Sequence, residues 1–158
     1  MLKKLLVLTL FVSFLAVGCD KLKEAAGNVT GTITGIESTY VGTWNADTAS
    51  SSTELGGSYF TVKDDGSMSF YDRELKKTIE YKSTWIIKTG STYTAIYNET
   101  DPNDDTVILG KYTVVITFEE KTGTDSTTTT TVANVSYRVE IEADKKDITY
   151  KGVFNKAQ

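Results

Sequence analysis

The sequence predicts an all-β protein in which eight antiparallel strands form an up-and-down meander that closes into a barrel. β-branched and aromatic residues dominate from Tyr40 onward, and they alternate with polar residues. The alternation is clearest in VSYRVEIE at 135–142, where an apolar or aromatic residue occupies every second position. A period of two is typical of strands that are buried on one face. Helical periodicity is absent after the N-terminal segment, which also favours an all-β fold.

Turn residues separate the strands and predict the topology. Asp64-Asp65-Gly66 is the strongest hairpin signal, because glycine adopts the positive φ that a tight turn requires, and Thr89-Gly90 is a second short turn. No connection is long enough to hold a crossover helix, so consecutive strands are expected to pair in antiparallel fashion. Closure into a barrel would remove both exposed edges, and a β-sandwich is the alternative. The expected strands are 40–45, 58–63, 67–72, 78–88, 92–98, 106–118, 130–142 and 147–154.

The N-terminal segment, residues 1–18, has the layout of a secretory signal peptide. Lys3 and Lys4 give it a positive start, an uncharged apolar run covers 5–17, and small residues follow. The apolar run is shorter than the roughly 20 residues of a membrane-spanning helix, so a signal peptide is favoured over a transmembrane anchor.

Cys19 is the single cysteine of the chain and directly follows this segment. An internal disulfide is therefore impossible, and the position needs another explanation. The residues LAVGC at 15–19 resemble a bacterial lipobox, in which the peptidase cuts before the cysteine and its thiol carries diacylglycerol, with fatty acids such as palmitate. The resemblance implies a lipoprotein of the bacterial cell envelope, attached to a membrane through Cys19 without spanning it. Residues 19–39 are then the lipidated cysteine and a flexible tether, and 40–158 are the domain.

The first expected strand contains Gly42-Thr43-Trp44, which resembles the G-x-W signature of lipocalin and lipocalin-like proteins. The resemblance implies a lipocalin-like barrel in which Gly42 lets the strand bend and Trp44 plugs the closed end. Both residues are therefore interpreted as structural.

The inward-facing residues of such a barrel are the candidate ligand site. They could fill the interior, or they could line a cavity for one small hydrophobic or amphipathic molecule, with tyrosine hydroxyls as its polar contacts. The candidate ligand-binding residues are Phe60, Phe70, Trp85, Tyr93, Tyr97, Tyr112 and Tyr137, and Ile87 is expected on the same inward face.

Composition argues against several functions. The chain has no histidine, and with Cys19 assigned to lipid it cannot build a Ser–His or Cys–His nucleophile, so no enzyme activity, metal or cofactor is expected. A net charge of -4 without a basic cluster argues against nucleic acid as a partner. Two hypotheses follow. One is a membrane-anchored lipocalin-like protein that binds a small apolar ligand, and the other is an interaction module, such as an adhesin, inhibitor or accessory subunit, that uses the barrel as a scaffold.

Overall fold

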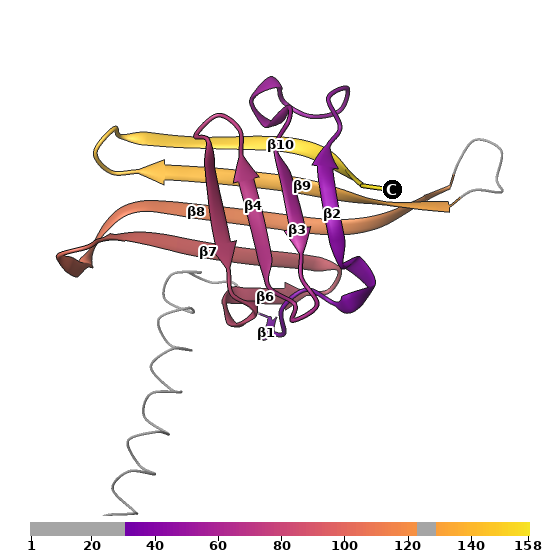
Figure 1. Ribbon diagram of the computed structural model, residues 1–158, viewed down its shortest axis with the longest axis horizontal. Helices are drawn as coiled ribbons and strands as arrows, with labels where there is room; N and C mark the ends of the chain where they lie inside the picture. Colours follow the sequence, from indigo (N-terminus) through magenta and orange to yellow (C-terminus); the bar gives the residue numbers. More distant parts are fainter. Residues whose placement is uncertain (1–30, 123–128) are drawn as a thin grey trace, which may run out of the picture. The chain divides into compact units, whose positions relative to one another are not determined.

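The computed structural model describes residues 31–122 and 129–158, and Cys19 with the predicted signal peptide lies outside them. The described chain forms ten strands in one antiparallel sheet, in the order β1-β6-β7-β8-β9-β10-β2-β3-β4-β5 (Figure 1). The strands are β1 (Thr32–Ile33), β2 (Gly42–Ala46), β3 (Tyr59–Val62), β4 (Met68–Asp72), β5 (Lys77–Tyr81), β6 (Ile86–Thr89), β7 (Thr92–Asp101), β8 (Asp104–Thr122), β9 (Thr129–Ile141) and β10 (Lys146–Lys156). Single 3-10 turns occupy η1 (Ser38–Tyr40), η2 (Thr53–Leu55) and η3 (Ser83–Trp85).

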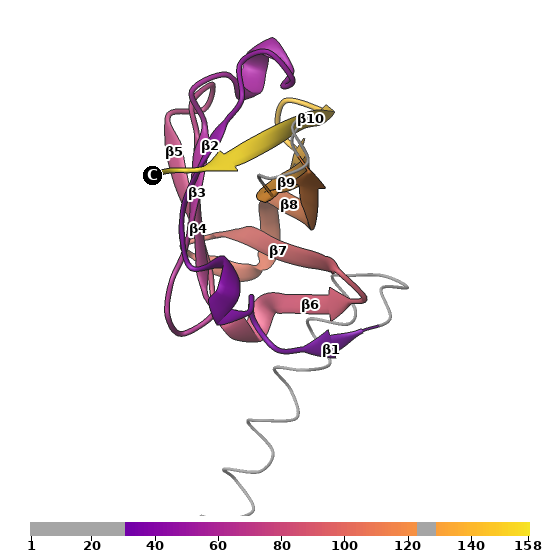
Figure 2. The same cartoon turned by 90° about the vertical axis from the view of Figure 1, so that its right-hand side faces the viewer.

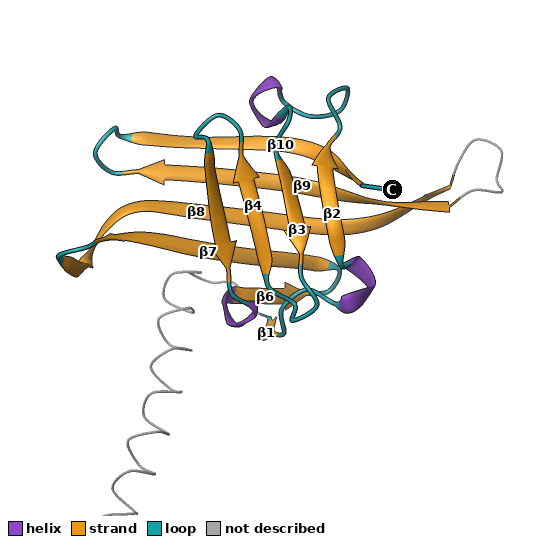
Figure 3. Cartoon of the chain, viewed as in Figure 1, coloured by secondary structure: helices purple, strands orange, loops and turns teal. Residues whose placement is uncertain are grey.

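The sheet folds over on itself into two layers. Strands β2 to β5 form one layer and strands β6 to β10 the other, and the two sets run across each other with the core between them (Figures 1 and 2). Pairing of β10 with β2, in which Phe154 lies opposite Ala46, carries the sheet continuously from one layer to the next. Figure 3 shows that strands account for most of the described chain and that loops are confined to their ends.

The expected closed barrel of eight strands is wrong. The run 78–88 was expected as one strand, but η3 divides it into β5 and β6. Trp85 N–H donates to the Lys82 carbonyl at 2.8 Å, so the chain turns there and enters the other layer instead of continuing the ladder. Among the described strands, β5 and β1 end the hydrogen-bonded sheet, which is therefore open between these two strands, and β5 does not pair with β6.

The same turn changes which residues of β6 face the core. Ile86 lies opposite Ala95 and belongs to the core, whereas Ile87 lies opposite Thr94 and is buried outside that cluster. A shift of one residue moves every side chain of a strand to the other face. The expectation that Ile87 faces inward is therefore wrong, and Ile86 takes its place.

The folded unit begins earlier than the expected boundary at Tyr40. It spans Gly31–Gln158, so residues 31–39 belong to it rather than to a tether. β1 pairs with β6 through Thr32 opposite Lys88, and Ile36 is buried in the core. The pairing and the burial of Ile36 outweigh the polar composition that suggested a flexible segment.

Both expected short hairpin turns are confirmed. Gly66 has a φ of 75° between β3 and β4, and Gly90 has a φ of 61° between β6 and β7. Asp65 Oδ1 accepts the backbone N–H of Ser67 at 2.9 Å and so holds the first turn in place. No helix in residues 31–122 and 129–158 has the length and apolar character needed to cross a membrane.

Candidate functional site

The structure buries most of the candidate ligand-binding residues between the two layers. Phe60, Phe70 and Tyr137 have no exposed surface, and Tyr93 and Tyr112 are buried. Trp85 and Tyr97 are half-buried, because η3 carries Trp85 to the margin where β5 and β6 separate. The rings of Trp85 and Tyr97 face each other there, with centroids 6.0 Å apart.

Aromatic rings fill the end of the interior beneath Trp44. The Phe118 ring lies 3.8 Å from the Tyr40 ring in a stacked arrangement and 5.0 Å from that of Trp44, measured between centroids. Trp44 is buried, is stacked on Phe60 at 5.9 Å, and donates its indole N–H to the Tyr40 carbonyl at 3.0 Å. Distances of this size are those of rings in contact, and the buried Trp44 indole has a partner for its N–H, as buried tryptophans usually do.

The middle of the interior is filled in the same way. Phe70 stacks on Tyr137 with centroids 4.6 Å apart and lies 6.2 Å from Phe154. Phe154 in turn lies 5.4 Å from Phe60, which joins this group of rings to the group around Trp44. The inward residues therefore contact one another across the two layers, as in a packed core.

One end of the interior carries buried polar groups. Asp72 is 3% exposed, and its Oδ1 accepts the backbone N–H of Leu75 at 3.0 Å. Within the described part of the chain, Asp72 Oδ2 and the Tyr137 hydroxyl both lack a partner of standard hydrogen-bond geometry. Burial, followed by the nearby Asp72 carboxylate, raises the pKa of Tyr137 far above its usual value. Burial likewise raises the pKa of Tyr81, so both phenols stay protonated at physiological pH.

Side chains join the layers where the sheet is open. Lys77 on β5 donates to Glu99 Oε2 on β7 at 2.6 Å, and the Tyr112 hydroxyl on β8 donates to the same oxygen at 2.9 Å. The Tyr81 hydroxyl donates to the Tyr112 carbonyl at 3.4 Å. Donation from Lys77 lowers the pKa of Glu99 despite partial burial. These contacts hold β5 against β7 and β8 without a backbone ladder.

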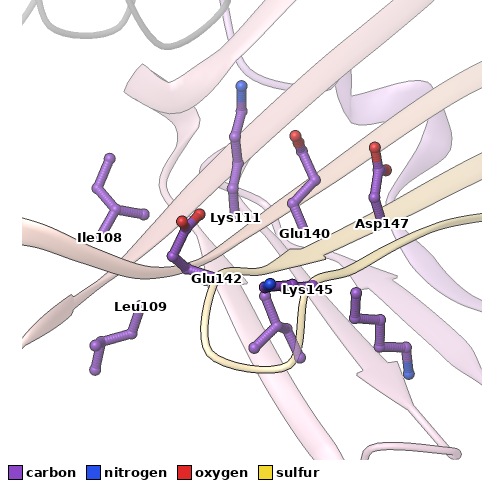
Figure 4. A pocket seen from close by; sticks show the side chains of 10 residues that line it. Ile108, Leu109, Lys111, Glu140, Glu142, Lys145 and Asp147 are labelled. Atoms are coloured by element: carbon purple, nitrogen blue, oxygen red, sulfur yellow. The ribbon is translucent and has the colours of Figure 1, made fainter.

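The β7–β8 hairpin and the β9–β10 hairpin diverge at the end of the sheet (Figure 1). A separate cleft is lined by residues of both hairpins. We call it the end cleft. Its volume is about 490 Å³, and Figure 4 shows Lys111, Glu140 and Asp147 pointing to one side of the sheet and Leu109 to the other. The end cleft is lined by Ile108, Leu109, Gly110, Lys111, Glu140, Ile141, Glu142, Lys145, Lys146 and Asp147.

Large apolar side chains are exposed at this end. Val107, Ile108 and Leu109 are 45%, 47% and 39% exposed, and Ile148 on β10 is 39% exposed. The sequence contained a signal for this surface, because TVIL at 106–109 interrupts the alternation that marks the rest of β8. The sequence prediction places this run inside the expected strand 106–118 and does not identify the end cleft.

Two carboxylates on the cleft wall, those of Glu140 and Asp147, form ion pairs with Arg138, which lies outside the lining. Arg138 donates from Nε and Nη2 to the two carboxylate oxygens of Asp147, at 2.8 Å each, and lies 3.3 Å from Glu140. Hydrogen bonding to Arg138 lowers the pKa of Asp147. Within residues 31–122 and 129–158, no group of three or more metal-ligating side chains could hold a metal ion.

Comparison of the chain with protein-family models, curated proteins and solved structures finds no match. The site must therefore be interpreted from its own geometry.

Proposed function

We propose that this chain is a lipid-anchored protein of the bacterial cell envelope whose β-domain binds another protein. The observation that carries the proposal is the contrast between the interior and the end of the sheet. Phe70 and Tyr137 lie in a packed core, whereas Ile108 and its neighbours expose apolar surface beside a cleft. Exposed apolar side chains grouped at one place are typical of a binding surface.

The packed interior favours the interaction hypothesis over the small-ligand hypothesis. A site for a small molecule usually encloses about 300–1,000 Å³ with a few polar groups that converge on the ligand. The inward rings of Phe60, Phe70 and Phe154 instead contact one another at centroid distances of 5.4 and 6.2 Å. An interior filled by its own side chains is expected of a rigid scaffold, whereas a protein that carries a small ligand needs internal space for it.

The lipid anchor and the family resemblance complete the proposal. LAVGC at 15–19 supports lipid attachment at Cys19. Gly42-Thr43-Trp44 at the start of β2, with Trp44 buried and β2 paired with the last strand, supports a distant relation to lipocalin-like proteins. Unlike a closed lipocalin-like barrel, this sheet is open, because β5 does not pair with β6.

The anchor is tested by metabolic labelling with an alkyne-modified fatty acid. The full chain should incorporate the label and sediment with membranes, and Cys19→Ser should do neither. Equal membrane recovery of both chains would refute the assignment of Cys19.

The interaction is tested by photo-crosslinking in cells that produce the chain. A photoreactive amino acid at Ile108 should yield an adduct of discrete mass, and the same group at Tyr59, which is 39% exposed on β3, should not. Native mass spectrometry of the purified chain should show no retained small molecule. An interior ligand of defined mass, with no adduct from either position, would favour the small-ligand hypothesis instead.

A further inference from the structure

The N-terminal segment of β8, Asp104–Leu109, has an unpaired edge on the side of β9. β9 ends at Ile141, which lies opposite Gly110, so Asp104–Leu109 extends beyond the last pair of the β8–β9 ladder. On this side, within the described part of the chain, Leu109 accepts one backbone bond, from Glu142 N–H at 3.3 Å. Toward β7 the register shifts twice between Glu99 and Asp101, which leaves the segment irregularly paired there as well.

An unpaired strand edge is a template for another strand. Free backbone N–H and C=O groups pair readily with an added chain, and proteins usually cover or charge such edges. Residues 104–109 match the usual strand length of about five or six residues, which is enough for one added strand. The end cleft lies beside this edge and offers room of about 490 Å³.

The side chains along the segment divide it into two parts. Its second half is apolar and exposed, with Val107, Ile108 and Leu109. Its first half and the adjoining turn carry Asp101, Asp104 and Asp105, and no lysine or arginine occurs between residues 99 and 109.

Asp104 at the tip is held ionised by hydrogen bonds from Thr106. Asp104 Oδ1 accepts the N–H of Thr106 at 3.0 Å and its hydroxyl at 2.6 Å, and these bonds lower the pKa of Asp104. Asp101 Oδ1 accepts the N–H of Asn103 at 2.7 Å. Asp104 therefore places a negative charge at the tip at neutral pH, beside the further carboxyl side chains of Asp101 and Asp105.

We propose that the end cleft binds an extended segment of another protein, which adds as an antiparallel strand to Asp104–Leu109. The segment is apolar where it meets Val107 to Leu109, and it carries lysine or arginine at its C-terminal end, which lies against the acidic tip. Backbone bonds provide affinity in this mode, and side-chain complementarity provides specificity. This inference rests on the proposed function and names its partner class.

A second copy of this chain fits the edge poorly. Two copies related by a twofold axis would pair antiparallel, and centring the pair on Thr106 and Val107 sets Asp105 opposite Ile108. Asp104 would then lie opposite Leu109, so carboxylates would be buried against apolar side chains at a cost in desolvation. A heterologous strand with a basic end avoids this cost.

The probe for the test is a fluorescent peptide, Thr-Val-Thr-Val-Thr-Val-Lys-Lys, and binding is measured by anisotropy. The full lipidated chain is held in lipid nanodiscs, and empty nanodiscs are the blank. A peptide with two glutamates in place of the lysines tests charge, and a peptide with N-methylated valines tests backbone pairing. We expect saturable binding of the first peptide that weakens with salt, and at least about tenfold weaker binding of the other two.

Two variants locate the binding on β8. Ile108→Thr keeps a β-branched residue but removes apolar surface, and it should weaken binding about fivefold. Asp104→Asn combined with Asp105→Asn should remove most of the salt dependence. Tyr59→Thr is the matched control, because Tyr59 is exposed to the same extent as Leu109 and lies on β3, so wild-type affinity is expected.

Several results would overturn the inference. Equal binding of the N-methylated peptide would exclude strand addition, and unchanged affinity of Ile108→Thr would place the binding elsewhere. Concentration-dependent self-association that Ile108→Thr abolishes would identify a second copy as the occupant. If the probe fails to bind while a photoreactive group at Ile108 still yields a discrete adduct, strand addition is wrong and the proposed interaction function stands. Absence of both would overturn both.

Discussion

Replacing Phe70 by alanine tests whether the interior is a packed core or the wall of a ligand cavity. The Phe70 side chain is fully buried, stacks on Tyr137 at 4.6 Å and approaches Phe154 at 6.2 Å. Phenylalanine-to-alanine changes in packed cores lower the free energy of unfolding by about 3–5 kcal/mol. With a urea dependence of about 2 kcal/mol per molar, the unfolding midpoint should fall by about 2 M.

The control for this prediction is Tyr71→Ala, the next residue on the same strand. Tyr71 is half-buried on the outer face of β4 and stacks on Tyr59 at 5.1 Å. Losing one cross-strand pair on an outer face should cost about 1 kcal/mol at most. Urea unfolding of residues 20–158, followed by the fluorescence of Trp44 and Trp85, measures both variants.

A small loss in the free energy of unfolding on replacing Phe70 by alanine would refute the packed-core interpretation. If Phe70→Ala loses no more stability than Tyr71→Ala, the ring does not fill space that the fold needs. Binding of an apolar dye to the wild-type domain, reduced in Phe70→Ala, would then indicate a cavity and restore the small-ligand hypothesis. Dye binding that appears only in the variant is the expected result, because it reports a new hole.

Three further predictions follow from local geometry. Gly42→Ala should lower the free energy of unfolding by about 1–3 kcal/mol, because a φ of 131° strains any residue with a Cβ, and thermal unfolding would measure the loss. A double-mutant cycle of Lys77→Met and Glu99→Gln should give at most about 1 kcal/mol of coupling at pH 7, since both side chains are about one-third exposed. Lys77 lowers the pKa of Glu99 in the folded chain. The coupling free energy should therefore be complete above the unfolded pKa of Glu99, about 4.3, and should be lost as the pH falls through the lower pKa of the folded chain. Full coupling at pH 2 would contradict the reasoning. Burial raises the pKa of Tyr81 and Tyr137 above the unfolded value of about 10, so stability should fall above pH 10 by about 2.7 kcal/mol per pH unit for the two groups together. Urea midpoints between pH 9 and pH 11.5 would measure this slope, and Tyr137→Phe should remove about half of it.

Most of the fold was predictable because alternation records which face of a strand is buried. The residues of 135–142 alternate in the structure as in the sequence, with Tyr137 and Val139 buried inside. Glycine in a tight turn is equally local, so the hairpins at Gly66 and Gly90 could be predicted from a few residues.

The opening of the sheet could not be predicted in this way. The residues Lys82 to Trp85 contain no glycine or proline, and each is compatible with a strand. Whether the chain continues or turns there depends on which layer Ile86 packs into, and that is a contact between residues far apart in the sequence. Most of the predicted inward residues are buried between the layers, but whether their rings leave space for a ligand depends on packing between the layers, which no local pattern records.

By itself, the sequence determined most of the strands, most of their buried faces and the two short hairpin turns, since these depend on neighbours along the chain. It also supplied the lipobox-like LAVGC at 15–19, on which the anchor proposal rests. Only the tertiary structure decided that β5 does not pair with β6, that the inward rings contact one another, and that Val107 to Leu109 lie uncovered beside a cleft. The physical reason is that the alternation that marks a buried face is a local pattern in the sequence. Strand lengths and contacts between distant segments decide whether another element covers that face.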